Sequence, residues 1–425
     1  VSRGDDHMRM QWLALWVVCI LTVYGCATRA YNPRPMEEVP FKERAQTQYE
    51  DGIRATAVVL SGEECKEVFG VDLYKRGIQP IWIEIENKKK EMAIFLPYGV
   101  DPDYFSPLEV PYMFRSGFSK AARSQMNQYF HEQQMDPFIA PGGVESGFVF
   151  TNLTRGTKAF NVDVLGEDGR IRSFTFFISV PGLPVSHSVV DFESLYSKDE
   201  IVKYDEKGLR KALESLPCCT TNNEGTEPGD PLNLVIISEG QDLHRALMRS
   251  GWNETAALSE TSATEQKKSP FSGRDYRYAP VSPLYVYGRP QDAAFQKARE
   301  TIRGRNQIRL WLTPMIFQGK NVWIGQISRN VAVRSTTKKG ATYRIDPDVD
   351  DTRSYFLEDL WYSQMLLKYG YVKGVGEAPI SEEPRRNLTG SPYFTDGYRT
   401  VIWLSSRPIA LQDVRFVEWE IPPER

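Results

Sequence analysis

The feature that most constrains the fold is a set of short segments between residues 50 and 185 in which apolar and polar side chains alternate. The clearest is Ile78–Glu86, and the others are Met92–Leu96, Phe148–Phe150, Ala159–Leu165 and Ile171–Val180. A period of two is typical of strands that bury one face, and turn signals such as Asp168-Gly169 separate the later segments. This pattern predicts an antiparallel sheet, and we expect an Ig-like β-sandwich over residues 49–190.

One helix is expected to interrupt this sandwich. Ser119 can cap a segment that runs to Gln134 and places Ala122, Met126 and Phe130 on one helical face, with Tyr129 beside them. The following part, residues 191–230, changes in composition. A short helix near Glu206–Leu216 is followed by a run rich in Thr, Asn, Gly and Pro, so we expect a linker with a short helix here.

A second domain is expected over residues 231–406, with a tail over residues 407–425. Its predicted elements are a buried strand at Leu232–Ile237, a helix at Glu239–Ser250 capped by Ser238, a strand at Leu284–Tyr287, a hairpin of Ile308–Phe317 and Val322–Arg334, a helix at Asp351–Tyr369 and a strand at Arg399–Ser405. Strands mixed with a few helices favour an α/β or α+β layer domain. The polar stretch Asn253–Ala279 reads as an insertion.

The N-terminal segment predicts where the protein is located. Arg9 precedes an apolar run from Trp12 to Val23, which ends in Gly25-Cys26. A run of this length is too short to span a hydrocarbon core of roughly 30 Å but suits a signal peptide. Because the junction resembles a bacterial lipobox, we expect a signal peptide over residues 1–25, lipidation of Cys26 and a tether over residues 26–48. The alternatives are a short uncleaved anchor and a buried helix. The interpretation implies a lipoprotein of the bacterial cell envelope, anchored in the membrane and facing the periplasm or the exterior.

The net charge limits the classes of ligand to be considered, and the cysteine content limits the possible disulfides. With 52 Lys and Arg against 55 Asp and Glu, the net charge is −3, which gives no support for nucleic-acid binding. Of the five cysteines, Cys65, Cys218 and Cys219 remain once the signal peptide and Cys26 are set aside. A disulfide from Cys65 to the Cys218/Cys219 pair and the absence of a structural disulfide are both compatible with this count.

Four ordered blocks resemble the LssY C-terminal domain family over about residues 230–405. The blocks are Ser282–Gln296, Ile308–Trp311, Val322–Gln326 with Ser328-Arg329, and Ile345–Asp350 with Glu358–Leu360. In some relatives this domain follows a membrane-embedded type-2 phosphatidic acid phosphatase. Because no segment here resembles the Pro-Ser-Gly-His motif of that enzyme, the resemblance does not imply phosphatase activity. Relatives often carry His where this chain has Asn306-Gln307 and Tyr343-Arg344.

Two groups of polar residues are candidates for ligand binding. Arg289, Gln291 and Asp292 follow a predicted strand, and Arg329 lies in the third block. Arg binds anions through its planar fork, and strand ends often form ligand sites. The alternative is a structural turn with an Arg289 salt bridge, and Asp292 could also cap a short helix that contains Phe295.

The second group is Asp346, Asp348 and Asp350, spaced as at the start of a calcium-binding loop. The Gly and Glu that an EF-hand needs further along are replaced by Asp351 and Leu357. We therefore favour helix capping by Asp350 or Asp351 over a divalent cation, and expect no other cofactor.

No complete catalytic set is apparent, so we expect binding or scaffolding at the cell envelope rather than an enzyme. The expected partners are the membrane, through the lipid, and an envelope protein or polar envelope ligand. Two alternatives stay open. One is an envelope hydrolase that acts on a phosphate- or sugar-containing substrate through the Asp cluster and Arg289, and the other is a calcium-dependent adhesion module.

Overall fold

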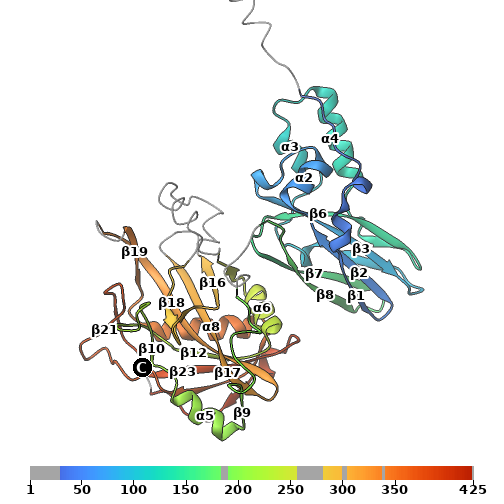
Figure 1. Cartoon of the computed structure of the whole chain (residues 1–425). Helices are drawn as coiled ribbons and strands as arrows, with labels where there is room; N and C mark the ends of the chain where they lie inside the picture. The colour runs from blue at the N-terminus through green and yellow to red at the C-terminus, as the bar shows by residue number, and fades with distance from the viewer. Residues whose placement is uncertain (1–28, 183–189, 256–280, 299–303, 337–339, 424–425) are drawn as a thin grey trace, which may run out of the picture. The chain divides into compact units, whose positions relative to one another are not determined.

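The computed structural model describes residues 29–182, 190–255, 281–298, 304–336 and 340–423, and the predicted signal peptide and Cys26 lie outside them. The chain divides into two compact units, unit 1 at Val1–Gly182 and unit 2 at Leu183–Arg425 (Figure 1). Within the described ranges, no helix combines the length and the apolar character that crossing a membrane requires.

Unit 1 contains two four-stranded antiparallel sheets, with strand orders β1-β2-β3-β6 and β5-β4-β7-β8. The strands are β1 Gln46–Glu50, β2 Ile53–Val59, β3 Ile78–Asn87, β4 Ala93–Leu96, β5 Phe138–Ile139, β6 Val144–Asn152, β7 Thr157–Gly166 and β8 Ile171–Ser179. The side chains of Gln46 and Gln48 on β1 donate to carbonyls of β8, which joins the two sheets. The predicted antiparallel β fold of this region is confirmed, with strands at the alternating segments.

The helices of unit 1 gather at one end of its strands (Figure 1). They are α2 Gly62–Phe69, α3 Glu109–Phe114 and α4 Lys120–Glu132. The Oγ of Ser119 accepts from the backbone N of Ala122, so α4 begins as predicted. The expectation of one inserted helix is wrong, because α2 and α3 are present too. In the aromatic core beneath them, the ring centroid of Phe69 lies 5.0 Å from that of Phe130 and 5.0 Å from that of Phe148.

Unit 2 is built on a ten-stranded mixed sheet with the order β13-β16-β17-β18-β12-β23-β20-β24, in which β19 also pairs with β18 and β9 with β17. The strands are β9 Val202–Tyr204, β12 Leu234–Ile237, β13 Asn253–Glu254, β16 Ala293–Ala298, β17 Arg305–Phe317, β18 Lys320–Thr336, β19 Gly340–Ile345, β20 Leu366–Lys373, β23 Tyr398–Leu404 and β24 Arg415–Val417. The buried strand β12 lies between an antiparallel neighbour, β18, and a parallel one, β23.

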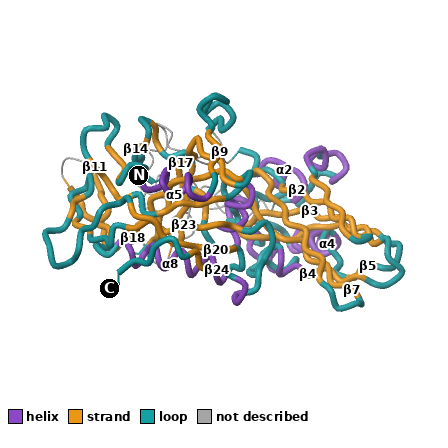
Figure 2. The backbone as a smooth tube through the Cα atoms, turned by 90° about the horizontal axis from the view of Figure 1, so that it is seen from below, coloured by secondary structure: helices purple, strands orange, loops and turns teal. Residues whose placement is uncertain are grey.

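Helices cover both faces of this sheet (Figure 2). They are α5 Glu206–Glu214, α6 Gly240–Arg249 and α8 Val349–Tyr362. Leu234 and Ile236 of β12 belong to the core that α6 and α8 share, whereas Val235 and Ile237 belong to the core that α5 closes. The alternation within β12 therefore sorts its side chains between two apolar layers, and the predicted α/β layer domain is confirmed.

Two predicted helical assignments in unit 2 are wrong. The helix predicted over Asp351–Tyr369 ends at Tyr362, and β20 begins at Leu366. Gln364 in between has a positive φ of 64°, which no helix continues through. The short helix predicted after Asp292 is the strand β16, which pairs with β17 along its whole length.

A second, small sheet in unit 2 has the order β11-β10-β14-β15. Its strands are β10 Cys219–Thr221, β11 Pro228–Pro231, β14 Tyr285–Val286 and β15 Arg289–Pro290, and β21 Arg385–Arg386 pairs with β22 Pro392–Tyr393 nearby in sequence. Leu232, Leu284 and Val286 pack on Trp311 and Ile324 of the large sheet. The segment predicted as a linker, residues 191–230, contains the predicted helix as α5 and also β9, β10 and β11, all of them parts of unit 2.

Candidate functional site

Arg289 and Asp292 face each other in a two-point ion pair. The Nε of Arg289 lies 2.9 Å from Oδ1 of Asp292, and Nη2 lies 3.0 Å from Oδ2. Nη2 also donates to the carbonyl of Leu312 and to the hydroxyl of Tyr196, while Asp292 accepts from the backbone N of Leu312. The planar fork of Arg289 thus binds an internal carboxylate and fastens β15 to β17, which is the salt-bridged turn considered from the sequence.

Gln291 has a similar local role. Its Oε1 accepts from the backbone N of Leu284 at 3.0 Å, across the turn between β14 and β15. Among the residues that the structure describes, none of the side-chain hydrogen bonds of Arg289, Gln291 and Asp292 reaches the aspartate run. The structure therefore pairs Arg289 with Asp292, leaves Gln291 bonded to Leu284, and joins none of the three to the second predicted group by these hydrogen bonds.

The aspartate run organises the start of α8. Asp348 is the N-cap residue, and its Oδ1 accepts from the backbone N of Asp350 and of Asp351. Asp346 accepts from the backbone N of Asp348, and Arg329 lies 2.9 Å from Asp351 and 3.7 Å from Asp346. The cap is thus Asp348, not Asp350 or Asp351, because the chain turns into the helix two residues earlier than the sequence pattern suggested.

The side chain of Asp350 is buried and belongs to a different hydrogen-bond network. It accepts from the backbone N of Asp396 at 2.6 Å and from the hydroxyl of Thr395, and it lies 3.3 Å from Arg353. Burial raises the pKa of Asp350, and Arg353 opposes that rise. Among the residues that the structure describes, no group of three or more His, Cys, Asp and Glu side chains is placed to hold a metal ion.

A third polar group, on the face of β17 and β18 that also carries Trp311 and Ile324, was not identified from the sequence. Arg305, Gln307 and Arg309 share one face of β17, opposite Asn330, Ser328 and Gln326 of β18, and all six side chains are buried. The Nη1 of Arg309 donates to Oε1 of Gln326 at 2.8 Å, and its Nε donates to the carbonyl of Ser282. From β11, Asp230 adds a buried carboxyl that accepts from the amide of Asn387 at 2.8 Å. We call Asp230, Arg309 and Gln326 the inter-sheet cluster.

The inter-sheet cluster contains an acid, Asp230, and a base, Arg309, and burial shifts the pKa of each toward its neutral form. Burial lowers the pKa of Arg309 to about 10, although the charge of Asp230 opposes the shift. Burial likewise raises the pKa of Asp230, against the hydrogen bond from Asn387 and the charge of Arg309. Asp230 and Arg309 thus interact at a distance without a hydrogen-bonded ion pair. Within the described part of the chain, the Nε2 of Gln326 is buried and has no hydrogen-bond partner.

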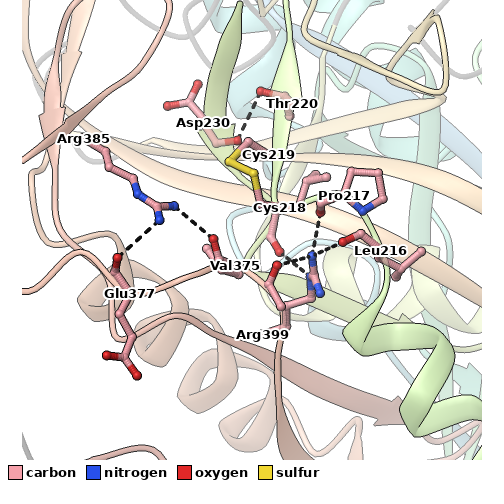
Figure 3. The surroundings of a disulfide bond; sticks show 12 residues. Leu216, Pro217, Cys218, Cys219, Thr220, Asp230, Val375, Glu377, Arg385 and Arg399 are labelled. Carbon is pink, nitrogen blue, oxygen red and sulfur yellow. Dashed lines mark hydrogen bonds between the residues drawn. A yellow bond between two sulfur atoms is a disulfide. The ribbon is translucent and has the colours of Figure 1, made fainter.

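A disulfide joins the adjacent residues Cys218 and Cys219 at the start of β10 (Figure 3). Cys65 is buried with a free thiol, so the disulfide considered between Cys65 and the pair is not formed. Figure 3 also shows Arg399 beside the pair, where its guanidinium points at backbone carbonyls. Arg399 donates to the carbonyls of Leu213, Leu216, Pro217, Leu232 and Gly374. This single side chain therefore ties the end of α5 and the start of β10 to β23.

Comparison with known families agrees with the resemblance seen in the sequence. Residues 210–398 match the family model described as LssY C-terminus, and the resemblance stated from the four sequence blocks is thereby confirmed. The match includes the inter-sheet cluster, the Cys218–Cys219 disulfide and both predicted polar groups. No curated protein matches the chain.

Proposed function

We propose, taking residues 210–398 as an LssY C-terminal domain, that the chain is a lipid-anchored protein of the bacterial cell envelope. In this proposal the domain acts by binding a polar envelope ligand rather than by catalysis. The lipid anchor rests on the ordered basic residue, apolar run and Gly25-Cys26 junction of the sequence. The binding role rests on the inter-sheet cluster.

The single observation that carries the binding role is the unsatisfied amide of Gln326. Buried polar groups are almost always hydrogen-bonded, because an unpaired one costs about 1–3 kcal/mol. Within the described ranges, the Nε2 of Gln326 is fully buried without a hydrogen-bond partner, and the Oε1 of the same side chain accepts from Arg309, which makes no ion pair with Asp230 there. A ligand oxygen, from a phosphate, a carboxylate or a sugar hydroxyl, would supply the missing acceptor and gain from the charge of Arg309.

The alternatives receive less support from the same geometry. A hydrolase that used Arg289 and the Asp cluster would need those groups to face a substrate, but Arg289 is bound to Asp292 and Asp348 caps α8. A calcium site would need the Oδ1 of Asp348, which accepts from two backbone N–H groups instead.

Thermal unfolding of the full chain with added probes tests the binding role. Inorganic phosphate and glucose serve as probes for the anionic and the hydroxyl-bearing ligand classes. We expect one of them to raise the melting temperature of the wild type and to leave that of Arg309→Met unchanged. Arg329→Met is the matched control, because Arg329 lies on the opposite face of the same sheet, near Tyr355 of α8, and should keep the response. An equal response of both variants, or none in the wild type, would contradict the binding role, and hydrolysis of p-nitrophenyl phosphate would favour the hydrolase.

Membrane fractionation tests the anchor. Replacing the Cys26 thiol by a hydroxyl removes the group that would carry the lipid, so Cys26→Ser should release the protein from membranes or leave an unprocessed precursor. Unchanged membrane partition and electrophoretic mobility of the variant would contradict the lipoprotein assignment.

A further inference from the structure

We infer that the Cys218–Cys219 disulfide is a thiol–disulfide exchange site whose redox state controls the order of the β10–β11 hairpin. The reductant would be a dithiol, either a small molecule or an exposed pair of cysteines on another protein. The site is separate from the proposed ligand contacts of Arg309 and Gln326 and does not depend on them.

Accessibility sets the direction of attack. Cys218 is exposed, whereas Cys219 is buried with only 7% of its surface accessible. A thiolate that approaches from solvent therefore meets Cys218 first. Cys65 offers the opposite case within the same chain, because its thiol is fully buried and burial raises its pKa well above the ordinary value. Exchange requires access and thiolate character, so Cys65 should stay unreactive in the folded protein.

The exchange balances as a two-electron transfer. A thiolate of the dithiol attacks the Sγ of Cys218, the bond between the two cysteine sulfurs breaks, and the Sγ of Cys219 leaves as a thiolate that takes a proton from water. The second thiol of the reductant then attacks the reductant's other sulfur, which is bonded to Cys218 in the mixed disulfide. This step releases the Sγ of Cys218 as a thiolate, which is protonated in turn. Two electrons and two protons pass to the cysteine pair, and the dithiol becomes a disulfide.

The effect of reduction should stay local because the backbone on either side of the pair is held. The carbonyl of Pro217 accepts from Nη2 of Arg399 at 2.6 Å, and the carbonyl of Cys218 accepts from the backbone N of Leu232 at 2.9 Å. Neither sulfur atom takes part in these hydrogen bonds of Arg399 or belongs to the apolar core that α5 closes. A disulfide between neighbours closes a ring around one peptide unit, so its opening frees the dihedral angles of that unit and loosens the strand that it begins.

The loosened strand leads directly to Asp230. Cys219 pairs with Pro231 across the hairpin, and the hydroxyl of Thr220 donates to the backbone carbonyl of Asp230 at 3.2 Å. Opening the ring should therefore raise the rate at which the hairpin amides open to solvent, while the amides of β12 and β18 keep their protection.

Differential alkylation and amide hydrogen exchange on the full folded chain test the inference. After dithiothreitol treatment under native conditions, iodoacetamide should label Cys218 and Cys219 but not Cys65, as read by peptide mapping. Amide exchange in the peptide that spans β10 and β11 should rise about tenfold or more, with β12 and β18 unchanged. Cys65→Ser is the matched control and should keep the full response to dithiothreitol.

The double variant Cys218→Ser/Cys219→Ser should show the fast hairpin exchange with or without dithiothreitol. If that variant does not fold, the comparison of oxidised and reduced wild type still decides. A disulfide that dithiothreitol opens only after unfolding would overturn the inference, and so would reduction that leaves the hairpin exchange unchanged.

Discussion

Arg399 donates to five backbone carbonyls from an interior position, and its burial lowers its pKa to about 10. A lysine at this position would carry its three donors on a single nitrogen. It could not reach all of the carbonyls that lie on different sides of the planar guanidinium. Since each acceptor left unpaired in the interior costs about 1–3 kcal/mol, we expect Arg399→Lys to lower the free energy of unfolding of unit 2 by about 3 kcal/mol or more. Chemical denaturation measures this, with Arg385→Lys, which loses two less buried carbonyl contacts, expected to cost about 1 kcal/mol. Equal losses in the two variants would contradict the role given to Arg399.

Lys158 on β7 provides a pH-dependent prediction. Burial lowers the pKa of Lys158 from 10.5 to about 8, and its Nζ donates to the carbonyl of Asn152 and the hydroxyl of Thr154. Between these two values the unfolded chain holds a proton that the folded chain has released, so stability from this group rises with pH in that window and is lost as pH falls through about 8.

We therefore expect the difference in unfolding free energy between wild type and Lys158→Met to grow in favour of the wild type, by up to about 1.4 kcal/mol per pH unit, between about pH 8 and pH 10. Below about pH 7 the difference should be constant. Urea titrations at several pH values measure it, and a difference that is flat through the whole range would contradict the lowered pKa.

The candidate site shows what could not be predicted from single residues. One of the two interpretations gave Arg289 a salt bridge in a structural turn but named no partner, and the structure shows that the partner is Asp292, three residues further on. The polar side chains of Gln307 and Arg309 alternate with the apolar Ile308 and Leu310, which in sequence is typical of the solvent-facing side of a half-buried strand. Arg309 is nevertheless buried, on the face where Leu232, Leu284 and Val286 pack on Trp311 and Ile324, and these packing residues come from distant parts of the chain.

At the scale of elements, the strands were predictable where a turn residue follows the alternation, as in β7, β8, β17 and β18. The misassigned elements have a common physical cause. The segments at β16 and β20 carry apolar residues at spacings that suit either a strand or a helix, and neighbouring strands decided the outcome. Short apolar runs of this kind have no local signal that outweighs sheet pairing.

Gly147 marks a close approach between elements in unit 1. It lies in β6, where the bridge between Gln134 and Phe148 brings the chain that leaves α4 against the strand. A Cβ at this position would meet the backbone of Gln134 and Met135 at distances that real side chains do not adopt. We expect Gly147→Ala to lower the free energy of unfolding of unit 1 by about 2 kcal/mol or more.

Gly240→Ala is the control for the exchange of glycine by alanine itself, since an added Cβ there meets no atom within 4 Å. It should change stability by no more than about 0.5 kcal/mol. Denaturant titration of both variants measures the two effects, and a neutral Gly147→Ala would show that the backbone at Gln134 moves aside.

At the scale of the whole molecule, the family match and the folded unit have different limits. The match ends at residue 398, where β23 begins, although β23 lies inside the sheet between β12 and β20. A fragment of residues 210–398 would lack Val401 and Ile402, one from each apolar layer. We expect this fragment to show no cooperative unfolding, and a fragment of residues 183–425 to unfold cooperatively. Thermal scans by near-ultraviolet circular dichroism compare them, and a cooperative transition in the shorter fragment would show that β23 is dispensable.

The parallel pairing of β12 with β23 also affects when this part of the sheet can form during synthesis of the chain. Leu234 pairs with Thr400 and Ile237 with Trp403, so the partner of this strand is made only after the intervening chain, residues 238–397, has been synthesised. Contacts between such distant segments form slowly, and an apolar strand with an open edge is a template for wrong pairing with other chains. We therefore expect the yield of folded protein to depend on how long the edge of β12 stays exposed before residue 404 has left the ribosome.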